Sequence, residues 1–244
     1  MSCKAVIFDY IGTLVNCRNY TMEASKQKLY NALVAEGFIF SEKSFLDAYN
    51  LSHEKYRKIR YEELREVTNA VWVAETLCRL GFEVKADDAR VKAALNFFFQ
   101  DFIDTLTLRE GARKLVKQNR AQCKVALISN FTYAPVIYKS LRKVGLSEFF
   151  NVVVVSEEVG WRKPSPQIFQ YALKKLQIQS NEAVYIGDSP NEDIRGATQV
   201  GLKTVFVSSQ FNTLIDLKES EQKPNHITND LTSLYQSLNQ ILSL

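Results

Sequence analysis

From about residue 107 onward, short apolar runs rich in β-branched residues alternate with longer stretches in which apolar residues recur every three or four positions. The apolar runs predict buried strands, and the longer stretches predict amphipathic helices. The predicted strands, including one at the start of the chain, are 4–10, 124–129, 150–156, 183–187 and 203–208. The predicted helices are 110–120, 135–145, 165–177, 192–201 and, after a polar loop, 229–242. Such alternation is typical of βαβ units, so the pattern predicts an α/β fold with a doubly wound parallel sheet.

The stretch between residues 20 and 105 carries almost no strand pattern. Apolar residues with helical spacing occupy the stretches 21–38, 41–59, 61–82 and 86–106. Because the first strand should join the same sheet as the later ones, this helical block is expected to be an insertion that lies over the edge of the sheet. We therefore predict a core domain of residues 1–15 and 107–244, and an inserted all-helical domain of residues 16–106.

Composition and charge narrow the class of protein. The chain has 244 residues, of which 46% are hydrophobic and 24% charged, as in an ordinary globular protein. It has no apolar run of roughly 18 residues and no apolar leader, so we expect a cytoplasmic protein without a membrane partner. The net charge of +4 comes from basic residues intermixed with acids, which argues against a nucleic-acid partner. The four cysteines lack paired spacing, which favours reduced thiols. The sequence does not indicate which oligomeric state the protein adopts.

Polar residues follow several of the predicted strands directly. They are Asp9, the pair Ser129–Asn130, the stretch 157–163 with Lys163, and the stretch 188–193 with Asp188 and Asp193. In an open parallel sheet, ligands bind outside the carboxyl ends of the strands. We therefore expect acids, a hydroxyl group and a lysine to converge on one edge of the sheet, where the helical insertion begins.

Each of these residues has a chemical and a purely structural interpretation. Asp9 is either a nucleophile or metal ligand, or a residue that caps a turn. Asp188 and Asp193 suit Mg²⁺, although acids are also common in the first turn of a helix. Lys163 could neutralise the clustered carboxylates and hold an anion, or it is a solvated loop residue. Ser129 could seat a phosphate, or it is a plain helix N-cap.

Taken together, the motifs "DYIGT", "LISN", "RKPSP" and "GDSPNED" resemble, in their order, those of the haloacid dehalogenase-like (HAD) superfamily. The resemblance covers the whole chain, and it implies a Rossmann-like core with a helical cap between the first and second motifs. It also implies that Asp9 is a covalent nucleophile, that Ser129 binds the transferred group and that Lys163 steadies both. Asp188, and less directly Asp193, would hold Mg²⁺ in such an enzyme.

The same motifs supply candidates for binding a small anionic, phosphorylated substrate. Thr13 and Asn130 belong to the first and second motifs, and Arg18 follows the nucleophile loop closely. Substrate choice is expected to depend on the cap, because the core supplies the common chemistry. The candidate cap contacts are Arg18, Tyr20, Tyr56, Arg60 and Trp72.

One position departs from the family's phosphatases. Two residues after the nucleophile they carry a second aspartate, which protonates the leaving group and then activates water, whereas this chain has Ile11. Isoleucine still offers the main-chain carbonyl that ligates Mg²⁺ in the family, so metal binding can survive while proton transfer is lost. General acid–base help is worth about 10²–10⁴ in rate, so hydrolysis of simple esters should be weak.

Three functions remain compatible with Ile11. The first is a Mg²⁺-dependent, phosphatase-type hydrolase whose leaving group needs little protonation. The second is a metal-independent 2-haloacid dehalogenase, since halide leaves without a proton; dehalogenases of the family usually have tyrosine at this position, and here Tyr10 lies one place earlier. The family's metal-free members usually lack the acid at Asp188, which argues against this second function. The third is a catalytically inactive binding or regulatory protein on the HAD scaffold.

Overall fold

The computed structural model describes residues 3–234 of the chain. Six parallel strands form one sheet in the order β5-β4-β1-β6-β7-β8. The strands are β1 Ala5–Phe8, β4 Lys124–Ser129, β5 Val152–Val155, β6 Ala183–Gly187, β7 Lys203–Val207 and β8 His226–Thr228. The predicted doubly wound parallel sheet is therefore confirmed. Strand β8 lies in the stretch predicted as a polar loop, and the predicted helix 229–242 lies mostly outside the described residues.

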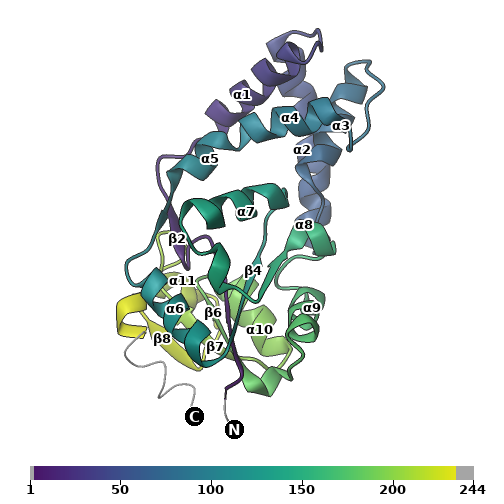
Figure 1. The fold of residues 1–244 in the computed structure, drawn as a ribbon. Coiled ribbons are helices and arrows are strands. Elements are labelled where there is room, and N and C mark those ends of the chain that lie inside the picture. Colours follow the sequence, from purple (N-terminus) through teal and green to yellow (C-terminus); the bar gives the residue numbers. More distant parts are fainter. Residues whose placement is uncertain (1–2, 235–244) are drawn as a thin grey trace.

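Helices cover both faces of this sheet (Figure 1). They are α6 Ala112–Gln122, α7 Ala134–Lys143, α8 Ser156–Val159, α9 Pro166–Leu176, α10 Arg195–Gln199 and α11 Leu214–Glu219. Successive residues of a strand point to opposite faces. In β1, Val6 and Phe8 accordingly pack in one apolar cluster with α6 and α7, whereas Ala5 and Ile7 pack in another with α9 and α10. Strand β1 is thus buried on both sides, which fixes its carboxyl end inside the molecule.

The inserted segment, residues 16–106, is mainly helical. Its helices are α1 Met22–Ala35, α2 Glu42–Glu62, α3 Asn69–Arg79, α4 Ala89–Phe98 and α5 Gln100–Thr105. They enclose an apolar cluster of their own that includes Phe45, Trp72 and Phe98. Two short antiparallel strands, β2 Val15–Cys17 and β3 Leu106–Leu108, lead the chain into and out of this segment. The division into a core domain and a cap domain at these strands remains our proposal.

The predicted helix over 61–82 is interrupted in the structure. Helix α2 ends at Glu62 and α3 begins at Asn69, with residues 63–68 in a non-helical linker between them. The amphipathic spacing continues through this linker, but in the structure the linker packs against the core. The Glu66 amide donates to the Gly160 carbonyl (3.0 Å), and Arg65 forms an isolated antiparallel β-bridge with Trp161. The inserted segment therefore touches the core at a second place, beside α8 (Figure 1).

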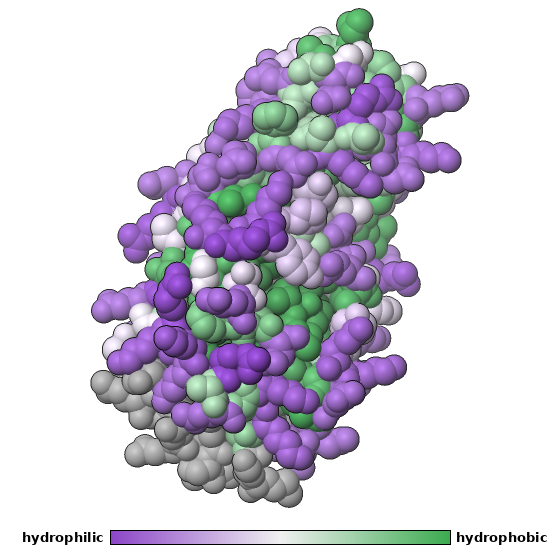
Figure 2. Space-filling model, in the orientation of Figure 1, coloured by the Kyte–Doolittle hydropathy of each residue, from purple (hydrophilic) through white to green (hydrophobic). Residues whose placement is uncertain are grey.

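Polar side chains cover most of the face shown in Figure 2, with smaller apolar areas between them. No helix within residues 3–234 is both long enough and apolar enough to cross a membrane.

Candidate active site

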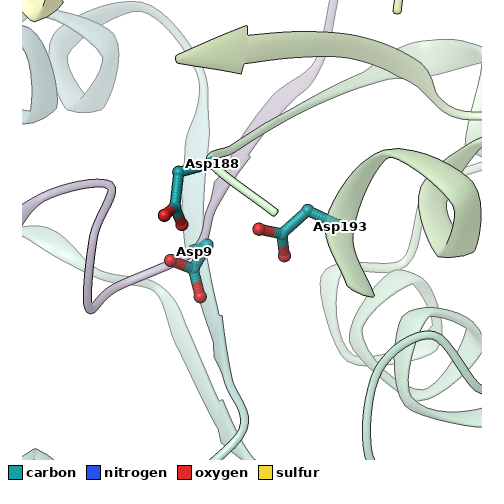
Figure 3. A group of neighbouring side chains, drawn as sticks. All are labelled: Asp9, Asp188 and Asp193. Carbon is teal, nitrogen blue, oxygen red and sulfur yellow. The ribbon is translucent and has the colours of Figure 1, made fainter. Parts of the chain in front are cut away.

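Three carboxylates meet at the carboxyl ends of β1 and β6. Asp9 directly follows β1, and its amide donates to the Ile186 carbonyl (2.9 Å), so the neighbouring strand holds the residue in place. Asp188 directly follows β6, and Asp193 lies in the π-helical turn η3, Pro190–Ile194. Figure 3 shows the carboxylates of Asp188 and Asp193 turned toward that of Asp9. One oxygen from each lies within 4.8 Å of the other two, and all three residues are buried.

Lys163 joins this cluster from the loop after α8. Its buried ammonium donates to Asp9 Oδ1 and to Asp193 Oδ1, both at 2.6 Å, and to the Tyr185 hydroxyl at 3.2 Å. Burial by itself lowers the pKa of Lys163. The carboxylates of Asp193 and Asp9 raise this pKa by more than burial lowers it, so the net shift is upward. Lys163 therefore stays protonated.

The two oxygens of Asp9 have different surroundings. Oδ1 accepts from Lys163, whereas Oδ2 is buried and has no hydrogen-bond partner among the described residues. Burial raises the pKa of Asp9; Lys163 lowers it, and the carboxylates of Asp193 and Asp188 raise it again. Three carboxylates face one ammonium, so with all groups ionised two negative charges remain unbalanced in a buried site. Such an arrangement favours a cation or protons.

Asp188 is fixed by three side chains. Oδ1 accepts from Thr13 Oγ1 (3.3 Å), and Oδ2 accepts from Ser209 Oγ (2.6 Å) and Asn212 Nδ2 (3.1 Å). Burial raises the pKa of Asp188, with Asp193 as the next cause. Ser209 and Asn212 follow β7, so the rule that located the other residues at strand ends would have found them had it been extended to this strand.

Glycine is required beside two of these acids. Gly12 has φ +100°, and a Cβ atom there would lie 2.4 Å from Asp188 Oδ2. A Cβ atom on Gly187 would lie 2.5 Å from the Asp193 carboxylate. Both approaches are too close for any side chain, so these glycines let the backbone pass directly beside the acids.

The acids open into a cavity of 630 Å³ between the sheet edge and the inserted segment. From the core it is lined by Asp9, Ile11, Ser129, Asn130, Lys163, Asp188 and Asp193, and from the inserted segment by Tyr20, Tyr49, His53, Arg60, Tyr61 and Trp72, among others. Asp9, Lys163 and Ser129 therefore lie at one cavity that has aromatic and basic walls.

Comparison with known proteins agrees with this geometry. The haloacid dehalogenase-like hydrolase family matches residues 3–201. The chain belongs to this family. It is 46% identical to the glyceraldehyde 3-phosphate phosphatase of Methanopyrus kandleri over 70 residues, which are 29% of this chain and 30% of that protein. It is 27% identical to haloacid dehalogenase-like hydrolase domain-containing protein 3 of Mus musculus over 244 residues, covering 98% of this chain and 94% of that protein.

A solved structure shares the fold of this HAD hydrolase. It is the 2-haloacid dehalogenase of Pseudomonas syringae, with a TM-score of 0.68 and 19% sequence identity, covering 98% of this chain and 99% of that one. At this identity the likeness concerns the fold alone. In the present HAD hydrolase, Tyr10 is fully buried in the apolar cluster beneath the sheet and is not among the cavity-lining residues. It therefore lacks access to a substrate in this structure.

Of the predicted substrate-binding residues Thr13, Asn130 and Arg18, only Asn130 lines the cavity. The Asn130 amide lines the cavity but also holds the main chain of Lys163: Oδ1 accepts from its amide (2.7 Å), and Nδ2 donates to its carbonyl (3.0 Å). Thr13 is buried, and its hydroxyl is directed to Asp188. Arg18 is exposed and is not among the cavity-lining residues, and the same holds for the half-buried Tyr56.

Two contributors to the site were absent from the sequence analysis. Tyr185 points from β6 into the buried cluster, where its hydroxyl donates to Asp193 Oδ1 (2.8 Å). Arg109 donates to the carbonyls of Gly12 and Ser208, and thereby links the loop after β1 to the loop after β7. Neither residue has a sequence signal, because Tyr185 reads as part of an apolar strand and Arg109 lies in a connecting turn.

The carboxylate cluster has the composition and spacing of a site for a hard divalent cation. Its oxygens are the ligands that Mg²⁺ prefers. Asp9, Asp188 and Asp193 would hold such an ion, and a contribution from the main-chain carbonyl of Ile11 stays a prediction from the family resemblance.

Proposed function

We propose that this HAD hydrolase is a Mg²⁺-dependent, phosphatase-type enzyme that acts on a small phosphorylated metabolite with Asp9 as nucleophile. The buried, unpartnered Oδ2 atom of Asp9 carries the proposal. A carboxylate oxygen without a hydrogen bond keeps its nucleophilic electron pairs, while Lys163 fixes the other oxygen and so sets the direction of attack. The similarity to a named sugar-phosphate phosphatase supports a phosphorylated substrate.

The reaction divides into two displacements at phosphorus. Asp9 Oδ2 forms a bond to phosphorus, and the bond between phosphorus and the leaving oxygen breaks with its electron pair on that oxygen. Water then attacks the phosphorus of the aspartyl-phosphate, which releases inorganic phosphate and restores Asp9. The Ser129 hydroxyl, at the cavity wall, would bind an oxygen of the transferred group, and the charge of the Lys163 ammonium would stabilise the negative charge of that group. Bound Mg²⁺ would neutralise negative charge on the phosphoryl group.

Ile11 determines which leaving groups the enzyme can release. Its side chain lines the cavity but has no proton to give to the leaving oxygen and cannot activate water. Both proton transfers then depend on solvent, and we propose that good substrates have leaving groups that are stable as anions. The same feature keeps the 2-haloacid dehalogenase as the second candidate function, because displacement of halide by Asp9 needs no proton. Asp188 and its three hydrogen bonds favour the metal-dependent function.

A paired assay tests the two functions. Phosphate release is measured from a panel that includes acyl phosphates, with Mg²⁺ and with EDTA, and halide release is measured from 2-chloropropionate without metal. We expect phosphate release that requires Mg²⁺ and is abolished by Asp9→Asn. Halide release that persists in EDTA would instead assign the chain to the dehalogenases. Absence of both activities, together with measurable ligand binding, would support an inactive binding protein.

A further inference from the structure

A buried ionic group connects the inserted segment to the active site. The carboxylate of Glu66, in the linker between α2 and α3, is fully buried. Its Oε1 accepts from Arg60 Nε (2.8 Å), and its Oε2 accepts from the Ser156 hydroxyl (2.6 Å) and lies 3.5 Å from an amino group of Arg162. Arg162 immediately precedes Lys163 in the chain. The ion pairs Arg162–Glu66 and Glu66–Arg60 therefore connect the residue next to Lys163 with the Arg60 guanidinium.

Arg60 is held in one orientation at the cavity wall. Its guanidinium carbon lies 5.5 Å from the ring centres of both Tyr61 and Trp72, and the side chain is only 11% exposed. An arginine fixed by rings and by one carboxylate loses little further conformational freedom when it binds another group. The fixed guanidinium is thus prepared to bind a ligand.

Glu66 uses only part of this guanidinium. Within residues 3–234, Nε is the donor to Glu66, and the two terminal amino groups of Arg60 have no acceptor. They are also not among the buried polar atoms that lack a partner, so they are accessible to solvent, and Arg60 is one of the residues that line the cavity. A planar pair of amino groups of this kind matches a carboxylate or phosphate, and the aromatic walls strengthen such a pair by excluding water.

We propose that Arg60 binds a second anionic group, a carboxylate or a phosphate, on the leaving-group side of the substrate, and that Glu66 is the positioning residue that holds Arg60 there. This inference rests on the proposed function, and it specifies the substrate class as a phosphomonoester or acyl phosphate that carries a further negative charge. The catalytic edge binds the transferred phosphoryl group, and Arg60 selects what is attached to it.

The experiment compares two ligands that differ by one anionic group. Calorimetry measures the binding of 3-phosphoglycerate and of glycerol 3-phosphate to the Asp9→Asn protein with Mg²⁺, a form that does not turn the ligands over. A charge-assisted hydrogen-bonded pair corresponds to about a ten- to hundredfold difference in affinity, so we expect that preference for 3-phosphoglycerate. Adding Arg60→Met should bring the ratio of the two affinities close to one, and Arg60→Lys should retain part of the preference.

Arg57 provides a matched control in the same helix and the same cavity. It is half exposed and already paired with Glu54 at 2.9 Å, so Arg57→Met should leave the ratio unchanged. Because Arg60→Met leaves the Glu66 carboxylate without its closest cation, Arg60→Met with Glu66→Gln serves if the single variant does not fold. Equal affinity for both ligands, or a ratio that survives loss of Arg60, would overturn the inference while leaving the proposed function intact. Binding of neither ligand would also overturn the inference, whereas the proposed function is decided by the phosphate-release assay described above.

Discussion

Replacing Ile11 with aspartate tests whether one missing proton donor limits hydrolysis. Ile11 lines the cavity two residues after Asp9 and is half-buried against the apolar core. An aspartate there would stand beside three carboxylates, and nearby like charges raise the pKa of a carboxyl group. The new side chain would therefore tend to hold the proton that a general acid must give. Because most of the isoleucine is withdrawn from water, its loss should cost about 1–3 kcal/mol of unfolding free energy.

The expected gain depends on the leaving group. A positioned general acid is worth about 10²–10⁴ in rate, which is about 2.7–5.4 kcal/mol of activation free energy at 1.36 kcal/mol per tenfold. We therefore expect Ile11→Asp to raise kcat/KM toward an alkyl phosphate by about this factor. The kcat/KM for p-nitrophenyl phosphate should change little, because this constant reports the first displacement and the nitrophenolate leaves without a proton. Rates for both substrates are measured with saturating Mg²⁺.

Ile11→Asn is the matched control, because asparagine has nearly the shape of aspartate but no acidic proton. If the acid is the only missing element, the alkyl phosphate is hydrolysed faster by the aspartate variant alone. A folded, Mg²⁺-binding Ile11→Asp protein that is no faster than Ile11→Asn would refute this reasoning. The defect would then lie in the position of the leaving group relative to residue 11.

Three further perturbations test the buried cluster. Burial raises the pKa of Asp9 in the folded protein, so the contribution of this carboxyl group to stability is lost as the pH rises through that raised value. In EDTA, Asp9→Asn should therefore gain thermal stability relative to wild type as the pH rises from 5 to 8. A constant difference between the two proteins would contradict this. Lys163→Met leaves buried carboxylates without their cation and should cost about 3–5 kcal/mol in urea unfolding, whereas a loss below 1 kcal/mol would mean that the ion pairs contribute little. Gly12→Ala should destabilise the protein by about 1–3 kcal/mol more than Gly37→Ala. Both glycines have positive φ (+100° and +91°), but only at Gly12 would the new Cβ atom meet Asp188. Equal losses of stability would show that this close approach is relieved at no cost.

The strands and the meeting of their polar ends were predictable from sequence because both depend on local patterns. The apolar runs located β1, β4, β5, β6 and β7, and the rule that parallel strands end at one edge placed Asp9, Ser129 and Asp188 together. Strand β8 was missed because it has only three residues, His226–Thr228, within a polar stretch, and it depends on pairing with β7.

Contacts between distant parts of the chain were less predictable. The spacing of apolar residues continues through the linker 63–68, and nothing local indicates that Glu66 is buried against the core. For the same reason Arg18, chosen for its short distance from Asp9 along the chain, is exposed, while Arg60 reaches the cavity from the middle of the inserted segment. Proximity in sequence is a poor guide to a cavity whose second wall is an insertion.

The charges of the cluster bear on all three functions that Ile11 leaves open. A site with three buried carboxylates and one ammonium is costly to fold unless a cation or protons balance it. A dehalogenase that uses Asp9 alone has no need for Asp188 and the hydroxyl and amide groups that fix it, and a scaffold that binds no ion would be more stable without this cluster. In the function proposed above, bound Mg²⁺ would remove the imbalance and keep Asp9 ionised, which is the form that a nucleophile needs. On this proposal, the arrangement that destabilises the ion-free fold would also prepare Asp9 as the nucleophile, and Ile11 would restrict which substrates Asp9 can cleave.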